Sequence, residues 1–200
     1  RIFTCELALD RDWPFQNLDE LQTNVKPPLL LQPLAGGPKY LGNKVVLHVG
    51  RMDRAEKYKG QDSLLYAFPE VYAQYPDAEL VLVGEGADLN RIRSIALSLP
   101  VQLQRSIYLP GFVSTNLLEQ LYRHCYLFAM PSLDEGFGIV YLEAMSRAKP
   151  CLGARSAATP YVIQEGKTGL LVEATRSPQQ VAEQINWFLG HPSTAEAMGR

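Results

Sequence analysis

The order of secondary-structure elements in this chain is set most plainly by residues 134–143, Asp134-Glu135-Gly136-Phe137-Gly138-Ile139-Val140-Tyr141-Leu142-Glu143. An apolar run over residues 126–130 precedes this segment and predicts a buried strand. After the two glycines, Ile139 and Leu142 begin a helical pattern. The segment therefore predicts a strand, a short loop and a helix. The first amides of such a helix and the positive end of its dipole favour an anion, most often a phosphate.

Two carboxylates flank this predicted phosphate site. Glu135 lies in the loop at the end of the strand, and Glu143 lies two helical turns further along. Gly136 and Gly138 allow the backbone to turn sharply and to approach a ligand closely. A phosphate site between two carboxylates suits a ligand that carries both phosphate and hydroxyl groups, as a sugar nucleotide does.

The composition is that of a soluble globular domain, with 46% hydrophobic and 20% charged residues. The net charge of −2 gives no electrostatic case for nucleic-acid binding. Of the three cysteines, Cys125 and Cys151 lie in apolar runs and are predicted to be small buried residues. A reducing, cytoplasmic setting fits them best. The sequence has no apolar stretch long enough to span a bilayer.

Strand and helix patterns alternate from Gly42 onward. Such alternation predicts an α/β fold of Rossmann-like type, with a parallel six-stranded sheet between two layers of helices. Ligands of these sheets bind at the carboxyl ends of the strands. The helix over residues 63–74 is expected to kink or to stop early at Pro69. The predicted strands are residues 44–49, 79–83, 107–109, 126–130, 150–154 and 169–172.

The chain divides into three predicted regions. Prolines and glycines break every periodic pattern in residues 1–42, which indicates a linker or the end of an upstream domain. The alternative is a disordered lead-in, and the pattern allows a short helix over residues 18–25. Residues 43–190 are predicted to form the ligand-binding domain, and residues 191–200 to start a C-terminal helix.

Basic residues follow the first strand of the predicted sheet. Arg51 comes directly after Gly50 and offers a planar fork that can hold a phosphate with two hydrogen bonds. Lys59 offers a mobile point charge, and Lys57 is a competing candidate for the same task. The alternative is that both lysines belong to a solvated basic loop.

Glu135 and Glu143 have seven residues between them, and Gly-Phe-Gly follows the first. This spacing resembles the Glu-x7-Glu motif of the retaining glycosyltransferases of the GT-B fold, glycosyltransferase family 4 or "glycosyl transferases group 1". That family includes sucrose synthases and many mannosyl- and glucosyltransferases. The resemblance covers residues 44–188 and implies the carboxyl-terminal, donor-binding half of such an enzyme. It also implies an amino-terminal acceptor domain in the same protein, and that any membrane association resides in that domain.

The resemblance implies a role for each matching residue. Glu135 would stand at the transferred sugar, while Arg51 and Lys59 would hold the donor diphosphate. Glu143 would accept hydrogen bonds from the ribose. The remaining implied contacts are with the diphosphate, by the loop residues Gly136, Phe137, Gly138 and Ile139, and with the ribose or base, by Gly84, Phe112 and Val113. Phe112 has the alternative of being a core residue.

The expected reaction moves a sugar from a nucleotide-diphosphate sugar to an acceptor hydroxyl, with no metal and no cofactor. The sequence has no Asp-x-Asp element, in keeping with a metal-independent mechanism. The donor base is left open among UDP, GDP and ADP, and so are the sugar, the acceptor and whether Glu135 acts as a nucleophile. Two other functions also stay open: a non-catalytic nucleotide-binding module and a related nucleotide-sugar epimerase. Without an acceptor domain, we expect nucleotide binding and little transfer.

Overall fold

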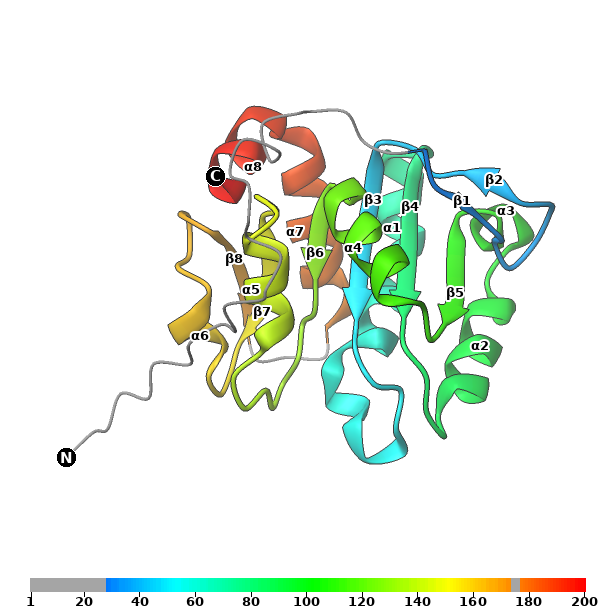
Figure 1. The fold of residues 1–200 in the computed structure, drawn as a ribbon, viewed down its shortest axis with the longest axis horizontal. Helices are drawn as coiled ribbons and strands as arrows, with labels where there is room; N and C mark the ends of the chain where they lie inside the picture. The colour runs from blue at the N-terminus through cyan, green and yellow to red at the C-terminus, as the bar shows by residue number, and fades with distance from the viewer. Residues whose placement is uncertain (1–27, 174–176) are drawn as a thin grey trace.

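A parallel sheet of six strands forms the centre of the molecule in a computed structural model that describes residues 28–173 and 177–200. The strand order is β5-β4-β3-β6-β7-β8, and all neighbouring strands are parallel (Figure 1). The strands are β3 (Lys44–Val49), β4 (Ala78–Val83), β5 (Ile107–Gly111), β6 (Leu127–Ala129), β7 (Cys151–Arg155) and β8 (Gly169–Glu173). Each of the six predicted strands is therefore present.

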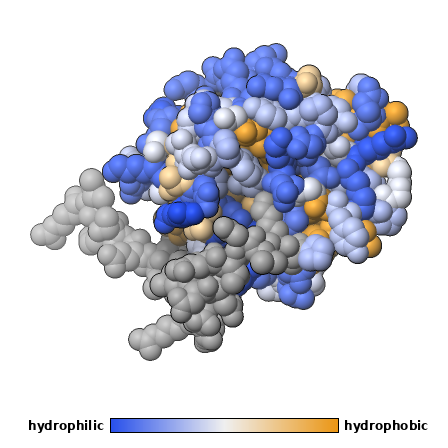
Figure 2. All heavy atoms as spheres, turned by 90° about the horizontal axis from the view of Figure 1, so that it is seen from above, coloured by the Kyte–Doolittle hydropathy of each residue, from blue (hydrophilic) through white to orange (hydrophobic). Residues whose placement is uncertain are grey.

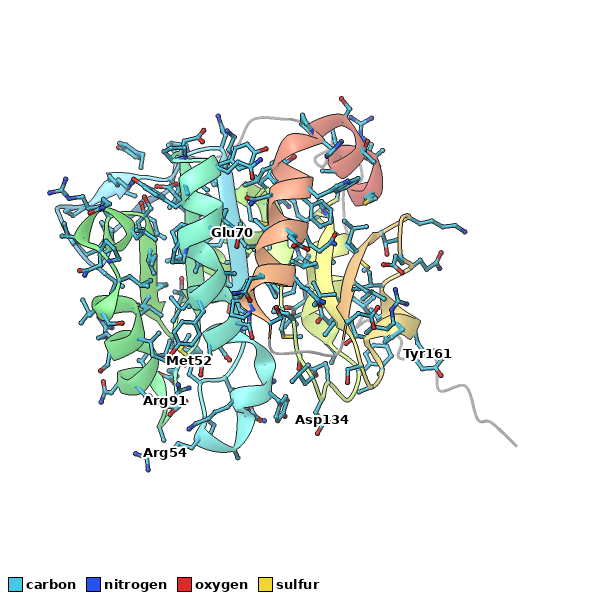
Figure 3. All side chains as sticks on the ribbon, turned by 180° about the vertical axis from the view of Figure 1, so that it is seen from behind. Met52, Arg54, Glu70, Arg91, Asp134 and Tyr161 are labelled. Carbon is cyan, nitrogen blue, oxygen red and sulfur yellow. The ribbon has the colours of Figure 1, made fainter. Side chains whose placement is uncertain are left out.

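Helices cover both faces of the sheet. One face packs against α1, α2 and α7, and the other packs against α4 and α5 (Figures 1 and 3). This is the predicted three-layer arrangement. The helices are α1 (Gln61–Gln74), α2 (Leu89–Ser98), α3 (Val101–Gln104), α4 (Thr115–His124), α5 (Ile139–Met145), α6 (Thr159–Val162), α7 (Pro178–Gly190) and α8 (Pro192–Gly199), with a 3-10 helix, η2 (Arg54–Lys59), before α1.

The side chains of the central strand β3 enter two hydrophobic cores in turn. Val46 packs in the core beneath α1 and α7, whereas Val45 and Leu47 pack in the core beneath α4 and α5. Because both faces are buried, the strand reads as a continuous apolar run and lacks the alternation of a half-exposed strand. The predicted and observed bounds of β3 therefore coincide.

Helix α1 continues through Pro69 to Gln74, so the expectation of an early stop there is wrong. Proline removes one backbone hydrogen bond and crowds the preceding turn. The inner face of α1 is nevertheless buried along its whole length, through Leu64, Phe68 and Val71 among others. That packing outweighs the local cost of the proline.

The described part of the amino-terminal region packs on the domain. Strands β1 (Leu30–Leu31) and β2 (Lys39–Tyr40) form a small antiparallel pair. Leu29 and Leu41 are buried in the core beneath α4 and α5, and the Leu34 amide donates to the Ile107 carbonyl at 3.0 Å. The short helix allowed over residues 18–25 lies outside the described residues. At the other end of the chain, α8 follows α7 within the region predicted to start a C-terminal helix.

The carboxyl ends of the six strands lie along one edge of the sheet, the lower edge in Figure 1. Met52, Arg54 and Asp134 lie at this edge in Figure 3, whereas Glu70 lies far from it on α1. The strand order reverses between β3 and β6, because the chain proceeds from β3 to β4 on one side and returns to β6 on the other. Ligands of open parallel sheets bind at such a reversal, so the loops after β3 and β6 form the candidate site.

Candidate functional site

Four charged side chains meet where the loops after β3 and β6 come together. Glu56 contacts Arg51 through the arginine's Nη2 atom and lies 3.6 Å from Lys59 Nζ. Lys59 Nζ also lies 3.8 Å from Glu135 Oε2. The order of charges is thus Arg51, Glu56, Lys59, Glu135, and we call these four residues the charge chain. Three of the four were expected at the site from the sequence, and Glu56 was not.

The charge chain is open to solvent at one end only. The Arg51 side chain is 77% exposed, whereas those of Glu56, Lys59 and Glu135 are 12%, 15% and 16% exposed. Electrostatic interactions strengthen when charges are removed from water, so the three inner groups interact more strongly than a surface ion pair. Lys57 is exposed and is not part of the charge chain. Of the two candidate lysines, it is therefore Lys59 that meets Glu135.

Several contacts fix the loop that carries Lys59. The Asp53 carboxylate accepts from the Ala55 amide at 3.2 Å and so caps η2. At the other end of η2, Gly60 takes a positive φ of 88° and lies against Pro131, so close that a Cβ atom would stand 2.8 Å from the proline. The Gln61 side chain donates to the Arg51 carbonyl at 3.1 Å. These contacts therefore fix the backbone segment that carries the two cations, Arg51 and Lys59.

The loop that carries Glu135 is held from both sides. The Leu133 amide donates to the Tyr58 carbonyl at 2.9 Å, and the Ser156 hydroxyl donates to the Leu133 carbonyl at 2.6 Å. The Ala158 amide donates to the carbonyl of Glu135 itself at 3.2 Å. Loops after β3 and β7 thus place the Glu135 side chain beside Lys59. One of its oxygens, Oε2, is buried and has no hydrogen-bond partner among the described residues.

The start of helix α5 follows the predicted pattern. Gly138 adopts a positive φ of 78° at the N-cap, and a Cβ atom there would stand 2.5 Å from the Tyr141 ring, so glycine is required. In the part of the chain that the structure describes, the amides of Gly136, Phe137 and Ile139 donate no hydrogen bond. They are therefore free to bind an anion, as is usual for the first amides of a helix. The helix has only seven residues, so we expect its dipole to add little.

Glu143 is oriented by a residue that the sequence did not reveal. The Tyr122 hydroxyl, on α4, donates to Glu143 Oε2 at 2.6 Å. Burial, together with the adjacent carboxylate, raises the pKa of Tyr122 well above its ordinary value, so the hydroxyl stays protonated and acts as a donor. Arg147 donates to the backbone carbonyl of Glu143 at 2.9 Å. Within the described residues, no hydrogen bond or ion pair joins Glu143 to the charge chain.

The residues proposed to line the base lie at the ends of β4 and β5. Phe112 is 75% exposed, so the alternative of a core residue is wrong, whereas the side chain of Val113 is buried in the core beneath α4 and α5. Gly84 has a φ of 141° and donates its amide to the Gly111 carbonyl at 3.0 Å. A Cβ atom on Gly84 would stand 2.0 Å from the Gly50 carbonyl oxygen. This glycine is thus required by the packing of the strand ends.

His48 behaves as the core residue that its place in β3 indicates. It is fully buried, and its Nδ1 atom lies 3.1 Å from the Ala129 carbonyl oxygen. Burial lowers the pKa of His48 to about 4, so the ring is neutral at physiological pH. Cys125 and Cys151 are also buried, as predicted.

Three broader features concern the described residues as a whole. The described residues contain no cluster of three or more histidine, cysteine or acidic side chains arranged to hold a metal ion. No helix in residues 28–173 and 177–200 has the length and hydrophobicity needed to cross a membrane. Hydrophilic side chains also predominate on the face of the molecule seen in Figure 2, where the hydrophobic ones form small separate patches.

Comparison with known proteins identifies the family. The family model described as "Glycosyl transferases group 1" matches residues 35–200. The chain belongs to this family. The resemblance based on Glu135, Glu143 and the glycines between them is thus confirmed at the level of the family.

Curated relatives and solved structures agree with this membership. Spore coat protein SA of Bacillus subtilis is 30% identical over 164 residues, which cover 80% of this chain and 43% of the relative. A GDP-mannose-dependent alpha-(1-6)-phosphatidylinositol monomannoside mannosyltransferase of Mycolicibacterium smegmatis is 34% identical over 155 residues, covering 74% of this chain and 40% of the relative. The chain therefore spans about two fifths of the length of these relatives.

Two structural neighbours are especially informative. The Anabaena protein Alr3699/HepE, solved in complex with UDP and glucose, has a TM-score of 0.68 and 26% identity, covering 78% of this chain and 41% of that one. The C-terminal domain of LpcC, a group 1 glycosyl transferase from Francisella tularensis, has a TM-score of 0.69 and 25% identity. That match covers 80% of this chain and 83% of the LpcC domain. The predicted Rossmann-like fold, one half of a GT-B fold, is thus confirmed.

Proposed function

We propose that this chain is the donor-binding half of a retaining glycosyltransferase, which moves a sugar from a nucleotide-diphosphate sugar to an acceptor hydroxyl. The observation that carries the proposal is the charge chain, in which Lys59 and Glu135 meet at the reversal of the strand order. Family membership supports it, and so does the UDP-glucose bound by the neighbouring Anabaena protein. The acceptor would bind to a second, amino-terminal domain of the same protein.

Arg51 and Lys59 would neutralise the diphosphate. When the bond between the sugar and the diphosphate breaks, negative charge accumulates on the departing phosphate. A guanidinium and an ammonium held at the site stabilise that charge as it develops. The backbone amides of Gly136, Phe137, Gly138 and Ile139 would add hydrogen bonds to the same oxygens. In this proposal the side chains and amides supply all the positive charge, so the transfer needs no metal.

Glu135 would act at the sugar. Its carboxylate is 16% exposed, and its buried Oε2 atom has no hydrogen-bond partner among the described residues, so it can accept a hydrogen bond from a sugar hydroxyl. As the bond to the diphosphate breaks, the sugar becomes positively charged, and an adjacent carboxylate stabilises it. Lys59 stands beside Glu135 and would bind the leaving group next to the sugar.

The donor site can be tested by calorimetric titration of this chain with UDP, GDP, ADP and their sugar conjugates. We expect one of the three diphosphates to bind, which would also identify the base. In an enzyme that carries this chain together with an acceptor domain, the anomeric configuration of the product, read by NMR, tests retention. Failure of all three diphosphates and their conjugates to bind would contradict the proposed function.

Replacement of Arg51 by alanine is expected to weaken binding of the preferred nucleoside diphosphate by about 1.5–3 kcal/mol, the scale of a hydrogen bond between charged groups. The variant removes the only exposed cation of the charge chain. The same titration measures the effect. Arg54→Ala is the matched control, because Arg54 lies in the same loop, is exposed and makes no ion pair with the described residues. Equal affinities for the two variants would refute the Arg51 contact.

Replacement of Tyr122 by phenylalanine is expected to weaken recognition of the ribose. Without the hydroxyl, Glu143 loses the donor that orients its carboxylate. The readout is the ratio of affinities for the preferred nucleoside diphosphate and its 2′,3′-dideoxy analogue. We expect this ratio to fall about threefold to tenfold, the effect of one hydrogen bond.

Tyr126→Phe serves as the control for Tyr122→Phe, because the Tyr126 hydroxyl also makes a hydrogen bond, to the Phe188 carbonyl at 2.7 Å, on the other face of the sheet. A purely structural role for Tyr122 would change both affinities in parallel and leave their ratio unaltered. That result would reject the proposed role of Tyr122 in orienting Glu143.

A further inference from the structure

Glu56 stands between the two cations proposed to bind the diphosphate. Its Oε1 atom contacts Arg51 Nη2, and its Oε2 atom lies 3.6 Å from Lys59 Nζ. The side chain is 12% exposed, and its Oε2 atom is buried with no hydrogen-bond partner in the part of the chain that the structure describes. A carboxylate is therefore already paired with the two cations that are proposed to bind the phosphate oxygens.

The η2 segment is held by other contacts. Asp53 caps it, and the Tyr58 carbonyl joins it to the loop after β6 through the Leu133 amide. Among the described residues, the Glu56 carboxylate accepts no hydrogen bond from the backbone, and its ion-pair partners are Arg51 and Lys59. A buried carboxylate loses its hydration, and that loss is offset by pairing with cations. The contacts of Glu56 are therefore with the site itself.

The charges of the site balance when no ligand is bound. Arg51 and Lys59 contribute two positive charges, and Glu56 and Glu135 contribute two negative ones. The donor, a nucleotide-diphosphate sugar, carries about two negative charges. The product, a free nucleoside diphosphate, carries about three negative charges near neutral pH, because its terminal phosphate ionises a second time with a pKa of about 6. A carboxylate at the centre of the site therefore disfavours the product more than the donor.

We propose that Glu56 is a built-in counter-ion of the donor site, which pairs with Arg51 and Lys59 when the site is empty and is displaced by the diphosphate. This role of Glu56 rests on the proposed function. Glu56 lowers the affinity for the nucleoside diphosphate product, returns to the cations as the product leaves, and so promotes release. Product release limits the turnover of many enzymes, so such a residue acts on rate as well as affinity.

The test is titration of the Glu56→Gln variant of this chain with UDP, GDP and ADP, and with their sugar conjugates. Glutamine keeps the shape and removes the charge. We expect affinity for the diphosphate that the wild-type chain prefers to rise about tenfold, and affinity for its sugar conjugate to rise less, about threefold. Glu70→Gln is the control, because it makes the same charge change on an exposed residue of α1, far from the site (Figure 3).

The outcomes separate this inference from the proposed function. If the wild-type chain binds one diphosphate and Glu56→Gln binds it equally or more weakly, Glu56 positions the cations and the counter-ion role is wrong. If neither protein binds any diphosphate or conjugate, the proposed function fails and this inference fails with it. Thermal melting shows whether the variant folds. Should Glu56→Gln not fold, Glu56→Asp takes its place, because the shorter side chain withdraws the charge from Lys59 and should also tighten binding.

Discussion

Replacement of Glu135 by glutamine is expected to reduce kcat for sugar transfer by about 10²- to 10³-fold, the usual effect of removing one group that stabilises charge in a transition state. The measurement needs an enzyme that carries this chain with an acceptor domain. Glutamine has nearly the same shape as glutamate, so its side chain can still lie beside Lys59. The hydrogen bond from the Ala158 amide is kept, because it goes to the backbone carbonyl of residue 135. Only the charge beside the sugar is lost.

Diphosphate binding should survive the same change. The diphosphate is assigned to Arg51 and Lys59, and loss of the carboxylate 3.8 Å from Lys59 removes a competitor for that ammonium. We therefore expect the affinity for the nucleoside diphosphate, measured by calorimetry, to stay the same or to rise slightly. A large loss of kcat with retained affinity is characteristic of a group that acts in the transition state.

Asp134→Asn is the control for Glu135→Gln. Asp134 is the preceding residue in the same loop, is exposed, and makes no ion pair with the described residues (Figure 3). We expect its variant to transfer sugar at close to the original rate. Unchanged turnover in Glu135→Gln would remove Glu135 from the mechanism. An equal loss in both variants would show that the loop needs its total negative charge, with no special role for Glu135.

The positions of the strands in the main sheet could be predicted from the sequence, whereas the small strand pair that packs beside it could not. Strands buried on both faces are continuous apolar runs, so β3 and β4 could be located almost to the residue. The small β1–β2 pair could not, because each strand has two residues and the region is anchored by the hydrogen bond from Leu34 to Ile107, 73 positions away (107 − 34). Local patterns carry no information about such a contact.

The same limit applies to the candidate site. Arg51, Lys59 and Glu135 could be proposed because each follows a strand that ends at the same edge of the sheet. Tyr122 could not, because it reaches Glu143 from a different helix, 21 positions earlier in the chain. Glu56 offered a weak signal, since it lies one helical turn before Lys59, but acidic and basic residues at this spacing are common on solvated surfaces.

Gly84 has two possible roles, contact with the ribose or base and close packing of the strand ends, and its replacement distinguishes them. The sequence proposes it as a wall of the ribose or base site, whereas the structure shows that its backbone lies against that of Gly50. Replacement by alanine is expected to lower the free energy of unfolding by about 3–5 kcal/mol, because it combines backbone strain at a φ of 141° with a Cβ atom 2.0 Å from the Gly50 carbonyl oxygen. Urea denaturation of this chain measures the loss.

Gly37→Ala provides the control, since a Cβ atom there has no neighbour within 4 Å and φ lies outside the positive range. We expect that variant to stay within about 0.5 kcal/mol of the original chain. If Gly84 serves only to let a ligand approach, Gly84→Ala will be as stable as Gly37→Ala and will lose nucleotide affinity alone. If it packs the strand ends, stability falls first. Affinity then falls as well, because relief of the clash moves Gly50, and Arg51 follows Gly50 directly.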